Sequence, residues 1–447
     1  MWLNFAFGTA GLGAIALAAV SSSSWAYEYQ GRLITGAYLS QERFSESGLM
    51  GTSNDFATAS FRFFLDVSKF RNDWEAIADV RDKYGFFDAF NKPMLDLTGA
   101  NTLQARQLSL SIPEKNVGFY GNFGRFPVTN AGAIYTDGAE LGYRLNPNWS
   151  VSAFGGLNPK RDDQYYVQYN PGCVDYGAYL LYQPKFSSWT KSFYFTNSFV
   201  TEDNFGHVDR RFWFENLVYE PDPADRFMTV SYLDFVPNPY IQDANLNYSH
   251  DFNPKFTLNT GLSTINAIEY YRQEGVLEQL GPSAYTEASV RGQYRLTPVD
   301  SLNLLADYGT RQADGTIRRE IQLTANLNQL GGDRRFAAYF GSGLRHEFVS
   351  NDVLAKFGGG YYTDKWELTL NTTVAYQKYT SGNVLTPIYG DFGTAFYFNK
   401  SLYGTVSFQE AVDQDVKIFS TYLNIGYRFG TKSAAPIRNG APPAEKI

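Results

Sequence analysis

The segment 365–377, KWELTLNTTVAYQ, alternates between apolar and polar side chains along its length. Its even-numbered face carries mainly leucine and valine between two aromatic residues, Trp366 and Tyr376, and its odd-numbered face is polar except for one alanine. A repeat of two residues is the period of a β-strand with one apolar face. A half-buried strand of a soluble sandwich has the same period, so composition has to separate the two classes.

The composition favours a membrane β-barrel. The chain has 447 residues, 17% of them aromatic, and a mean hydropathy of −0.33. A soluble chain of this length usually divides into domains joined by linkers, and no linker-like tract precedes the C-terminal segment. Beyond the N-terminal segment, no stretch approaches the ~20 apolar residues of a membrane-spanning helix. Together these features predict a single all-β, antiparallel up-and-down transmembrane barrel in the outer membrane of a Gram-negative bacterium.

Residues 1–26 have the pattern of a secretory signal peptide. The apolar run 7–20 is too short to span a membrane as a helix, and Ser24 and Ala26 are small residues at the positions that a signal peptidase reads. We expect cleavage after Ala26. No Lys or Arg precedes the apolar run, so either the free amine supplies the positive charge or the chain begins upstream. An N-terminal membrane anchor is the alternative interpretation.

The last strand pattern ends at residue 429. Its odd positions from 419 onward are apolar or aromatic except for Thr421, and they end in Tyr427 and Phe429. This resembles the last strand of outer-membrane barrels, which closes on the first strand and carries an aromatic signal for the barrel-assembly machinery. We therefore predict a transmembrane barrel over 27–429. The segment 430–447 is rich in Pro, Ala and Gly, and we expect a disordered periplasmic tail there.

Turn residues divide the barrel region into strands. Short turns rich in Asn, Asp and Pro lie at 146–149, 252–255, 297–300, 363–366 and 399–401. Longer connections lie at 41–54, 83–103, 127–136, 158–172 and 265–282. This alternation predicts short periplasmic turns and longer external loops, with about 22 strands in a range of roughly 18 to 24.

Strand parity separates the two faces of the predicted wall. From 285 onward, charged residues of both signs share one face of each strand and apolar residues share the other. A charge that faces lipid at the membrane midplane costs ~2–4 kcal/mol, so the charged face is predicted to be the lumen. The candidate lumen-lining residues are Glu287, Arg291, Arg295, Asp307, Arg318, Glu320, Arg345, Glu347, Glu367 and Asn371. The candidate lipid-facing aromatic residues are Trp366, Tyr376, Tyr427 and Phe429.

One segment carries a family resemblance. Residues 121–158 contain Gly124-Arg125, then Asp137-Gly138, then Phe154-Gly155-Gly156. This order resembles a hairpin of porin-like outer-membrane barrels, including alginate-export-type channels, and covers about a tenth of the chain. The resemblance implies a porin-like barrel and leaves the solute open. The same residues also suit strand-end geometry, with glycine at a bulge and Asp-Gly at a turn.

The predicted barrel suggests two functions. The first is a channel for small solutes or ions with a polar lumen of mixed charge. The second follows from size, because 22 strands close at a diameter of roughly 40–45 Å. Such a lumen is filled either by loops that fold inward, at 83–103, 158–172 or 265–282, or by a separate protein. In the latter case the barrel is the sheath of a conduit around a multihaem cytochrome or a lipoprotein.

Other functional classes are disfavoured. His207, His250 and His346 fall on different predicted strands, so neither a catalytic group nor a metal site is expected, and no cofactor. Cys173 is the only cysteine, which excludes an intrachain disulfide and a c-type haem motif. The net charge of −7, without a basic patch, disfavours nucleic acid. The expected partners are outer-membrane lipids, the assembly machinery during insertion and a possible lumen-filling protein.

Overall fold

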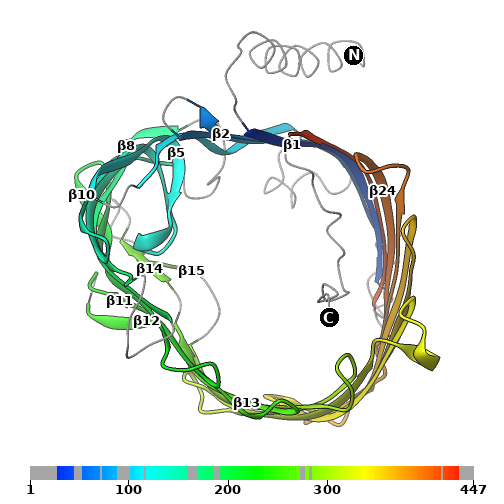
Figure 1. Cartoon of the computed structure of the whole chain (residues 1–447). Coiled ribbons are helices and arrows are strands. Elements are labelled where there is room, and N and C mark those ends of the chain that lie inside the picture. The colour runs from blue at the N-terminus through cyan, green and yellow to red at the C-terminus, as the bar shows by residue number, and fades with distance from the viewer. Residues whose placement is uncertain are drawn as a thin grey trace.

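The alternating runs of the sequence form strands that pair with their neighbours in chain order (Figure 1). The structure is a computed structural model. It describes residues 28–44, 53–70, 73–87, 101–114, 117–159, 169–184, 192–236, 238–266, 268–271, 277–280, 284–413 and 416–431. The predicted signal peptide lies outside these residues, and so does all but the first two residues of the predicted tail.

The strands are long, and most have ten or more residues. They are β1 (Glu28–Phe44), β2 (Ser53–Phe70), β3 (Trp74–Phe87), β4 (Asn101–Ile112), β5 (Gly118–Val128), β6 (Ile134–Asn146), β7 (Trp149–Pro159), β8 (Tyr169–Tyr182), β9 (Ser192–Asn204), β10 (His207–Glu220), β11 (Asp225–Asp234), β12 (Tyr240–Asn253), β13 (Phe256–Ile265), β14 (Ile268–Tyr271), β15 (Leu277–Leu280), β16 (Tyr285–Arg295), β17 (Ser301–Arg311), β18 (Ile317–Leu327), β19 (Phe336–Glu347), β20 (Ser350–Tyr362), β21 (Trp366–Tyr379), β22 (Val384–Leu385), β23 (Ile388–Tyr397), β24 (Leu402–Val412) and β25 (Val416–Gly430). Two short 3₁₀ turns lie at η3 (Thr129–Ala131) and η5 (Leu330–Gly332).

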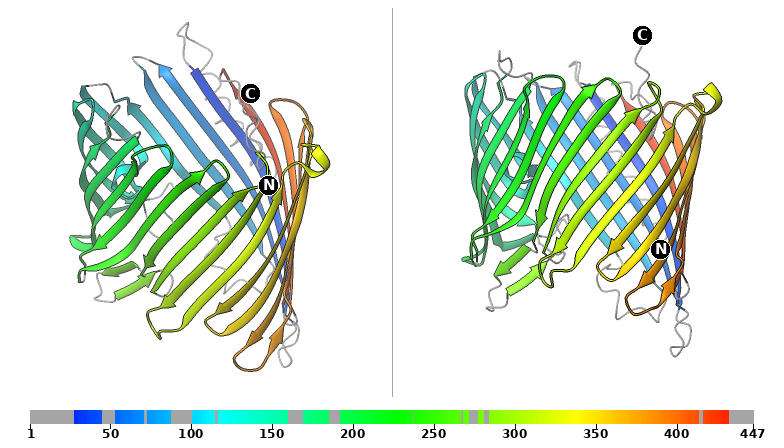
Figure 2. Two further views of the ribbon diagram at one scale, coloured as in Figure 1. Left: turned by 60° about the horizontal axis from the view of Figure 1, so that its bottom comes forward. Right: turned by 90° about the horizontal axis from the view of Figure 1, so that it is seen from below.

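The sheet closes into a barrel through its first and last strands. β1 pairs with β2 and also with β25, from Gln30↔Gly430 to Phe44↔Val416. The main sheet has 23 strands, of which β22 has only two residues, so 22 strands form the wall. β14 and β15 form a separate hairpin. The predicted antiparallel barrel of about 22 strands is therefore confirmed, and Figure 2 shows its strands tilted against the barrel axis.

Asparagine side chains shape three of the short turns. The side-chain oxygens of Asn146, Asn253 and Asn399 each accept hydrogen bonds from the backbone N–H groups two and three residues ahead, at 2.8–3.1 Å. These contacts replace the next ladder bonds and reverse the chain within two to four residues. All five predicted short turns connect strands at the end of the barrel where β1 begins and β25 ends.

The predicted longer connections lie at the opposite end. Four of them, at 41–54, 83–103, 158–172 and 265–282, separate consecutive wall strands there. The fifth corrects the expectation. Residues 127–136 are not an irregular loop, because β5 continues to Val128 and β6 begins at Ile134. Not every connection at this end is long, since only Phe205 and Gly206 separate β9 from β10.

The two faces of each strand differ in exposure. In β18, Ile321 and Leu323 are more than half exposed, whereas Glu320, which precedes them, is buried. Exposed apolar side chains on alternate residues suit a wall that contacts lipid on one side. Among the described residues, no helix is long and apolar enough to cross a bilayer.

Candidate functional site: the inner face of the barrel

One hairpin leaves the wall and enters the barrel. Pairing of β4 with β5 reaches Leu108↔Arg125, and pairing of β6 with β7 starts at Asp137↔Leu157. Between these points, the two arms of residues 126–136 pair with each other. Figure 1 shows this hairpin beside the label β5, bending into the ring. We call residues 126–136 the shelf.

An ion pair marks the point where the shelf leaves the wall. Nε and Nη2 of Arg125 donate to the two carboxylate oxygens of Asp137, and Nη1 donates to the carbonyl oxygen of Ala105 at 2.9 Å. Arg125 is 6% exposed. A guanidinium that donates two hydrogen bonds to one carboxylate fixes the relative orientation of the two groups as well as the distance between them. The motif residues Arg125 and Asp137 therefore form one unit that joins the arms of the hairpin at its base.

The shelf rests on the inner surface of β7–β11. Its residues Val128 and Ala131 are buried in a cluster with Val200, Phe212 and Phe214. A cluster of this kind is stabilised by removal of apolar area from water. The contact is therefore a packed interface, and the shelf is held against the wall.

Hydrogen bonds from wall side chains also fix the position of the tip of the shelf. The Tyr194 hydroxyl donates to Oδ1 of Asn130 at 2.6 Å, and Oγ1 of Thr196 donates to the Asn130 carbonyl at 3.0 Å. The Tyr232 hydroxyl donates to the Gly132 carbonyl at 3.2 Å. Side chains of two wall strands, β9 and β11, thus donate hydrogen bonds to a tip of only a few residues.

Two glycines are required by this geometry. Gly132, at the tip, has a φ of +78°, and a Cβ there would lie 2.7 Å from the Tyr232 ring. A Cβ on Gly138 would lie 2.1 Å from the carbonyl oxygen of Gly155 on the next strand. Any larger residue at either position would push the hairpin off its neighbour. The Asp-Gly and Gly-Gly pairs of the sequence motif therefore serve close approach of β6 and β7.

The docked shelf shows which face of the wall points inward. Phe214 contacts the shelf and pairs with Tyr232, which pairs with Asp243 on β12. Directly opposed residues of paired strands lie on the same face of a sheet. The pairing registers therefore identify the inward residues of each following strand. On β13 these include Ser263, which is paired with Glu287 on β16.

The same registers place every candidate residue of the sequence analysis. The assignment of inward residues can be followed in this way through β17–β21 and β23–β25 and back to β1. At the closure, Ser40 of β1 and Ser420 of β25 are paired, and their hydroxyl oxygens are 2.9 Å apart. The residues whose positions face the interior are Glu287, Arg291, Arg295, Asp307, Arg318, Glu320, Arg345, Glu347, Glu367 and Asn371. Those on the outward face are Trp366, Tyr376, Tyr427 and Phe429. Their roles in a lumen and a membrane stay predictions.

Five of the ten inward candidates form one charged network centred on Arg318. Its guanidinium contacts Glu287 at 3.1 Å, Glu320 at 3.0 Å and Glu347 at 3.5 Å. Glu347 is shared with Arg345, at 3.2 Å. Three carboxylates around one guanidinium give this part of the network an excess of negative charge. The network joins residues of β16, β18 and β19, so it covers one sector of the inner face.

The other candidates make contacts outside the ion pairs of this network, although Asp307 is a direct neighbour of its member Glu320. Arg295 donates to the carbonyl of Pro254 at 3.2 Å, at the short-turn end of the barrel. Glu367 accepts a hydrogen bond from the Tyr397 hydroxyl at 3.1 Å. Asn371 is paired across strands with Asp391, and Asp307 with Glu320. Inward polar groups therefore extend over much of the wall, as the parity of the sequence predicts.

The three histidines are separate. His207 begins β10, His250 bonds Asp225 at 2.7 Å on β11, and His346 bonds Asn351 at 2.8 Å on β20. No three His, Cys, Asp or Glu side chains lie together as metal ligands in the described part of the chain. The thiol of Cys173 donates a hydrogen bond to Oδ1 of Asn204 at 3.1 Å.

Two interior features escaped the sequence analysis. The shelf is predicted above as an ordinary connection, although Phe126 and Val128 share one parity, as apolar residues of a strand do, and could have indicated pairing. The charged network also includes Asp352, which takes two hydrogen bonds from Arg345 at 2.8 and 2.9 Å. Its parity within β20 carries the same signal as that of the neighbouring strands.

A closed barrel of 22 strands, with exposed apolar residues outside and charges inside, is a transmembrane β-barrel of the outer-membrane type. No family model matches the chain, and no curated protein matches it.

Three similar solved structures come from two Gram-negative bacteria. OccAB4 of Acinetobacter baumannii is 9% identical, with 90% of this chain and 98% of that chain covered, at a TM-score of 0.45. OccK11 (OpdR) of Pseudomonas aeruginosa is 12% identical, with 90% and 96% covered, at 0.43. OpdQ of Pseudomonas aeruginosa is 8% identical, with 91% and 98% covered, at 0.45.

Proposed function

We propose that this barrel is an outer-membrane channel for small solutes or ions. The observation that carries the proposal is the inward-facing charged network of Arg318, Glu287, Glu320 and Glu347. Charges of both signs on an inner wall are stable when water fills the interior, because buried unsolvated charges are costly. A wet, charged lumen is the condition for passage of polar solutes.

The shelf supports the same proposal. A 22-stranded wall would enclose a lumen of roughly 40–45 Å measured between backbones. Residues 126–136 extend into this space and are held by Phe212 and Tyr232. In a channel, such an element narrows the path and selects by size, while charged residues on the remaining wall select by charge.

Neutralising two inward arginines should change ion selectivity. In Arg291→Gln/Arg318→Gln the inner wall loses two positive charges, so its negative excess grows and cations should be preferred more strongly. Screening over a Debye length of ~8 Å at physiological salt weakens this preference but does not remove it. The reversal potential across a planar bilayer with a tenfold salt gradient measures the shift.

Arg319→Gln is the matched control. Arg319 neighbours Arg318 on β18 but lies on the outward face, so its loss should leave the reversal potential unchanged. Equal reversal potentials of the native barrel and the double variant, when both conduct, would show that these arginines do not set the selectivity of the channel. A shift of equal size in the control would instead show that the charge acts from outside the lumen.

The second candidate is a sheath around a partner protein, and the strand count favours it. Barrels of this width among transporters are plugged, and the described part of the shelf contacts only one sector of the wall, β7–β11. In this proposal a multihaem cytochrome or a lipoprotein occupies the remaining lumen, and Arg318 and its neighbours contact its surface. Neutralising Arg291 and Arg318 would then weaken retention of the partner rather than change selectivity.

A further inference from the structure

A row of polar residues crosses the outer face of four neighbouring strands near the long-connection end of the barrel. Arg319 of β18 is paired with His346 of β19, and His346 is paired in turn with Asn351 of β20. Asn351 is paired with Lys378 of β21. Because directly opposed residues of paired strands lie on the same face of a sheet, all four share the outward face. We call these four residues the outer row.

The two cations of the outer row have no acidic partner. The side chains of Arg319 and Lys378 are exposed, and neither forms an ion pair or a side-chain hydrogen bond with the residues that the structure describes. Between them, Nδ1 of His346 lies 2.8 Å from Oδ1 of Asn351. Protonation of this imidazole adds a third positive charge to the row.

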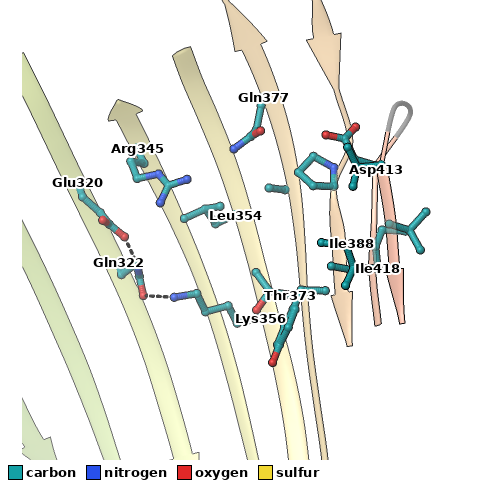
Figure 3. Close-up of a pocket in the computed structure, with 16 residues that line it drawn as sticks. Glu320, Gln322, Arg345, Leu354, Lys356, Thr373, Gln377, Ile388, Asp413 and Ile418 are labelled. Carbon is teal, nitrogen blue, oxygen red and sulfur yellow. Dashed lines mark hydrogen bonds between the residues drawn. The ribbon is translucent and has the colours of Figure 1, made fainter. Parts of the chain in front are cut away.

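No carboxylate balances these charges on the same face. The outward positions of β17–β21 hold no Asp or Glu. The acidic residues of these strands alternate with the outward ones and face the interior. Figure 3 shows part of that inner face, where Glu320, Arg345 and Lys356 lie. The outer face of this sector therefore has a local excess of positive charge, which attracts an anion.

Apolar side chains adjoin the outer row on the side toward the middle of the wall. Ile321, Leu344 and Val353 are paired in consecutive strands, and each is more than half exposed. Together with the outer row and Tyr376, they line a groove of about 650 Å³. Ten of the fourteen residues that line this groove have outward positions, so it opens on the outer face.

The outer row lies at the level of a membrane–water boundary. In β21 the exposed aromatic residues Trp366 and Tyr376 are ten positions apart. At ~3.3 Å per residue and a tilt of ~40°, this separation is roughly 25 Å along the membrane normal, which is the height of the apolar band of such barrels. Lys378 lies two residues beyond Tyr376, so its ammonium is at the level of lipid head groups in the external leaflet.

We infer that this groove binds one phosphorylated lipid of the outer leaflet. Its phosphate groups contact Arg319 and Lys378, and its acyl chains lie over Leu344 and Val353. A guanidinium and an ammonium both bind phosphate through charge-assisted hydrogen bonds. The adjoining apolar residues select an anion that carries hydrocarbon chains. The inference concerns the outer face, so it holds whether the lumen is open or filled by a partner.

Native mass spectrometry of the detergent-solubilised barrel measures this binding. The delipidated barrel is titrated with diphosphorylated lipid A, and the fraction that carries one lipid gives the affinity. Phosphatidylcholine supplies acyl chains with a head of no net charge, and inorganic phosphate supplies the charge without chains. We expect lipid A to bind at least about tenfold more tightly than phosphatidylcholine, and an about tenfold excess of inorganic phosphate should not displace it.

Three variants locate the site. Arg319→Gln/Lys378→Gln should weaken lipid A binding at least about tenfold, because it removes two charge-assisted contacts. Leu344→Ala should weaken it severalfold by removing apolar contact with the acyl chains. Lys417→Gln is the matched control, since Lys417 is exposed on the outward face of β25 near the same end of the barrel but does not line the groove. Its loss should leave the affinity unchanged. Heat-modifiable migration on gels verifies that each barrel is folded.

The outcomes separate a defined site from general attraction to the outer face. Equal lipid A affinity of the native barrel and the double variant would overturn the inference. An equal loss of affinity in Lys417→Gln would also overturn it, because binding would then follow the total charge of the outer face. Displacement of the lipid by inorganic phosphate would indicate a simple anion site, and equally tight phosphatidylcholine would indicate ordinary lipid contact. Either result rejects the phosphorylated-lipid site.

Discussion

Phe212→Ala is expected to give a barrel with a larger and less steady ionic current than the native one. Phe212 is 2% exposed, lies under the shelf and has the Arg210 guanidinium over its ring at 4.3 Å. Truncation of a buried phenylalanine typically costs ~3–5 kcal/mol. Because the ladder bonds of β10 do not depend on this ring, the loss falls on docking of the shelf, which then moves away from the wall.

Phe199→Ala is the matched control for this experiment. Phe199 lies on the neighbouring strand β9 but is 43% exposed on the outward face, so its removal should not change the current. Single-channel recording of native, Phe212→Ala and Phe199→Ala barrels gives the comparison. A folded Phe212→Ala barrel with native conductance would show that the shelf does not limit the path.

Leu370→Arg is expected to impair insertion of the barrel into membranes. Leu370 is 50% exposed on the outward face of β21, and its cross-strand partner Phe392 is also exposed. An arginine that faces lipid near the midplane costs ~2–4 kcal/mol. Folding into liposomes under increasing urea, followed by heat-modifiable gel migration, measures the free energy lost.

Asn371→Arg provides the internal control, because Asn371 is the next residue and faces the interior. The guanidinium there is hydrated by the lumen, so the variant should fold like the native barrel. Equal folding of Leu370→Arg and Asn371→Arg would mean that the assigned faces of β21 are wrong, and with them the inward assignment of its neighbours.

Much of the wall could be predicted from the sequence because its physics is local. A strand of period two has one face for lipid and one for water, so the parity of Glu367 and Leu370 already separates the faces that the registers later define. Asparagine turns such as Asn253 satisfy their own backbone within three residues. Strand parity and turn residues can be recognised in a short stretch of sequence. They predict the number and order of the strands and which face of each strand points inward.

The interior could not be predicted in the same way because its contacts join distant residues. Asn130 is held by Tyr194, which is 64 residues away, and Gly132 by Tyr232, which is 100 residues away. The position of Arg125 before a Gly-containing connection gave no sign that it would be buried and pair with Asp137.

The most direct test of the central claim is the single-channel current of the native protein, extracted in mild detergent together with whatever it retains. The proposed channel predicts a steady current in planar bilayers from a preparation with no second protein at unit ratio. A silent complex that contains a cytochrome or lipoprotein at unit ratio, and that becomes leaky when this partner is removed, would contradict the channel and establish the sheath.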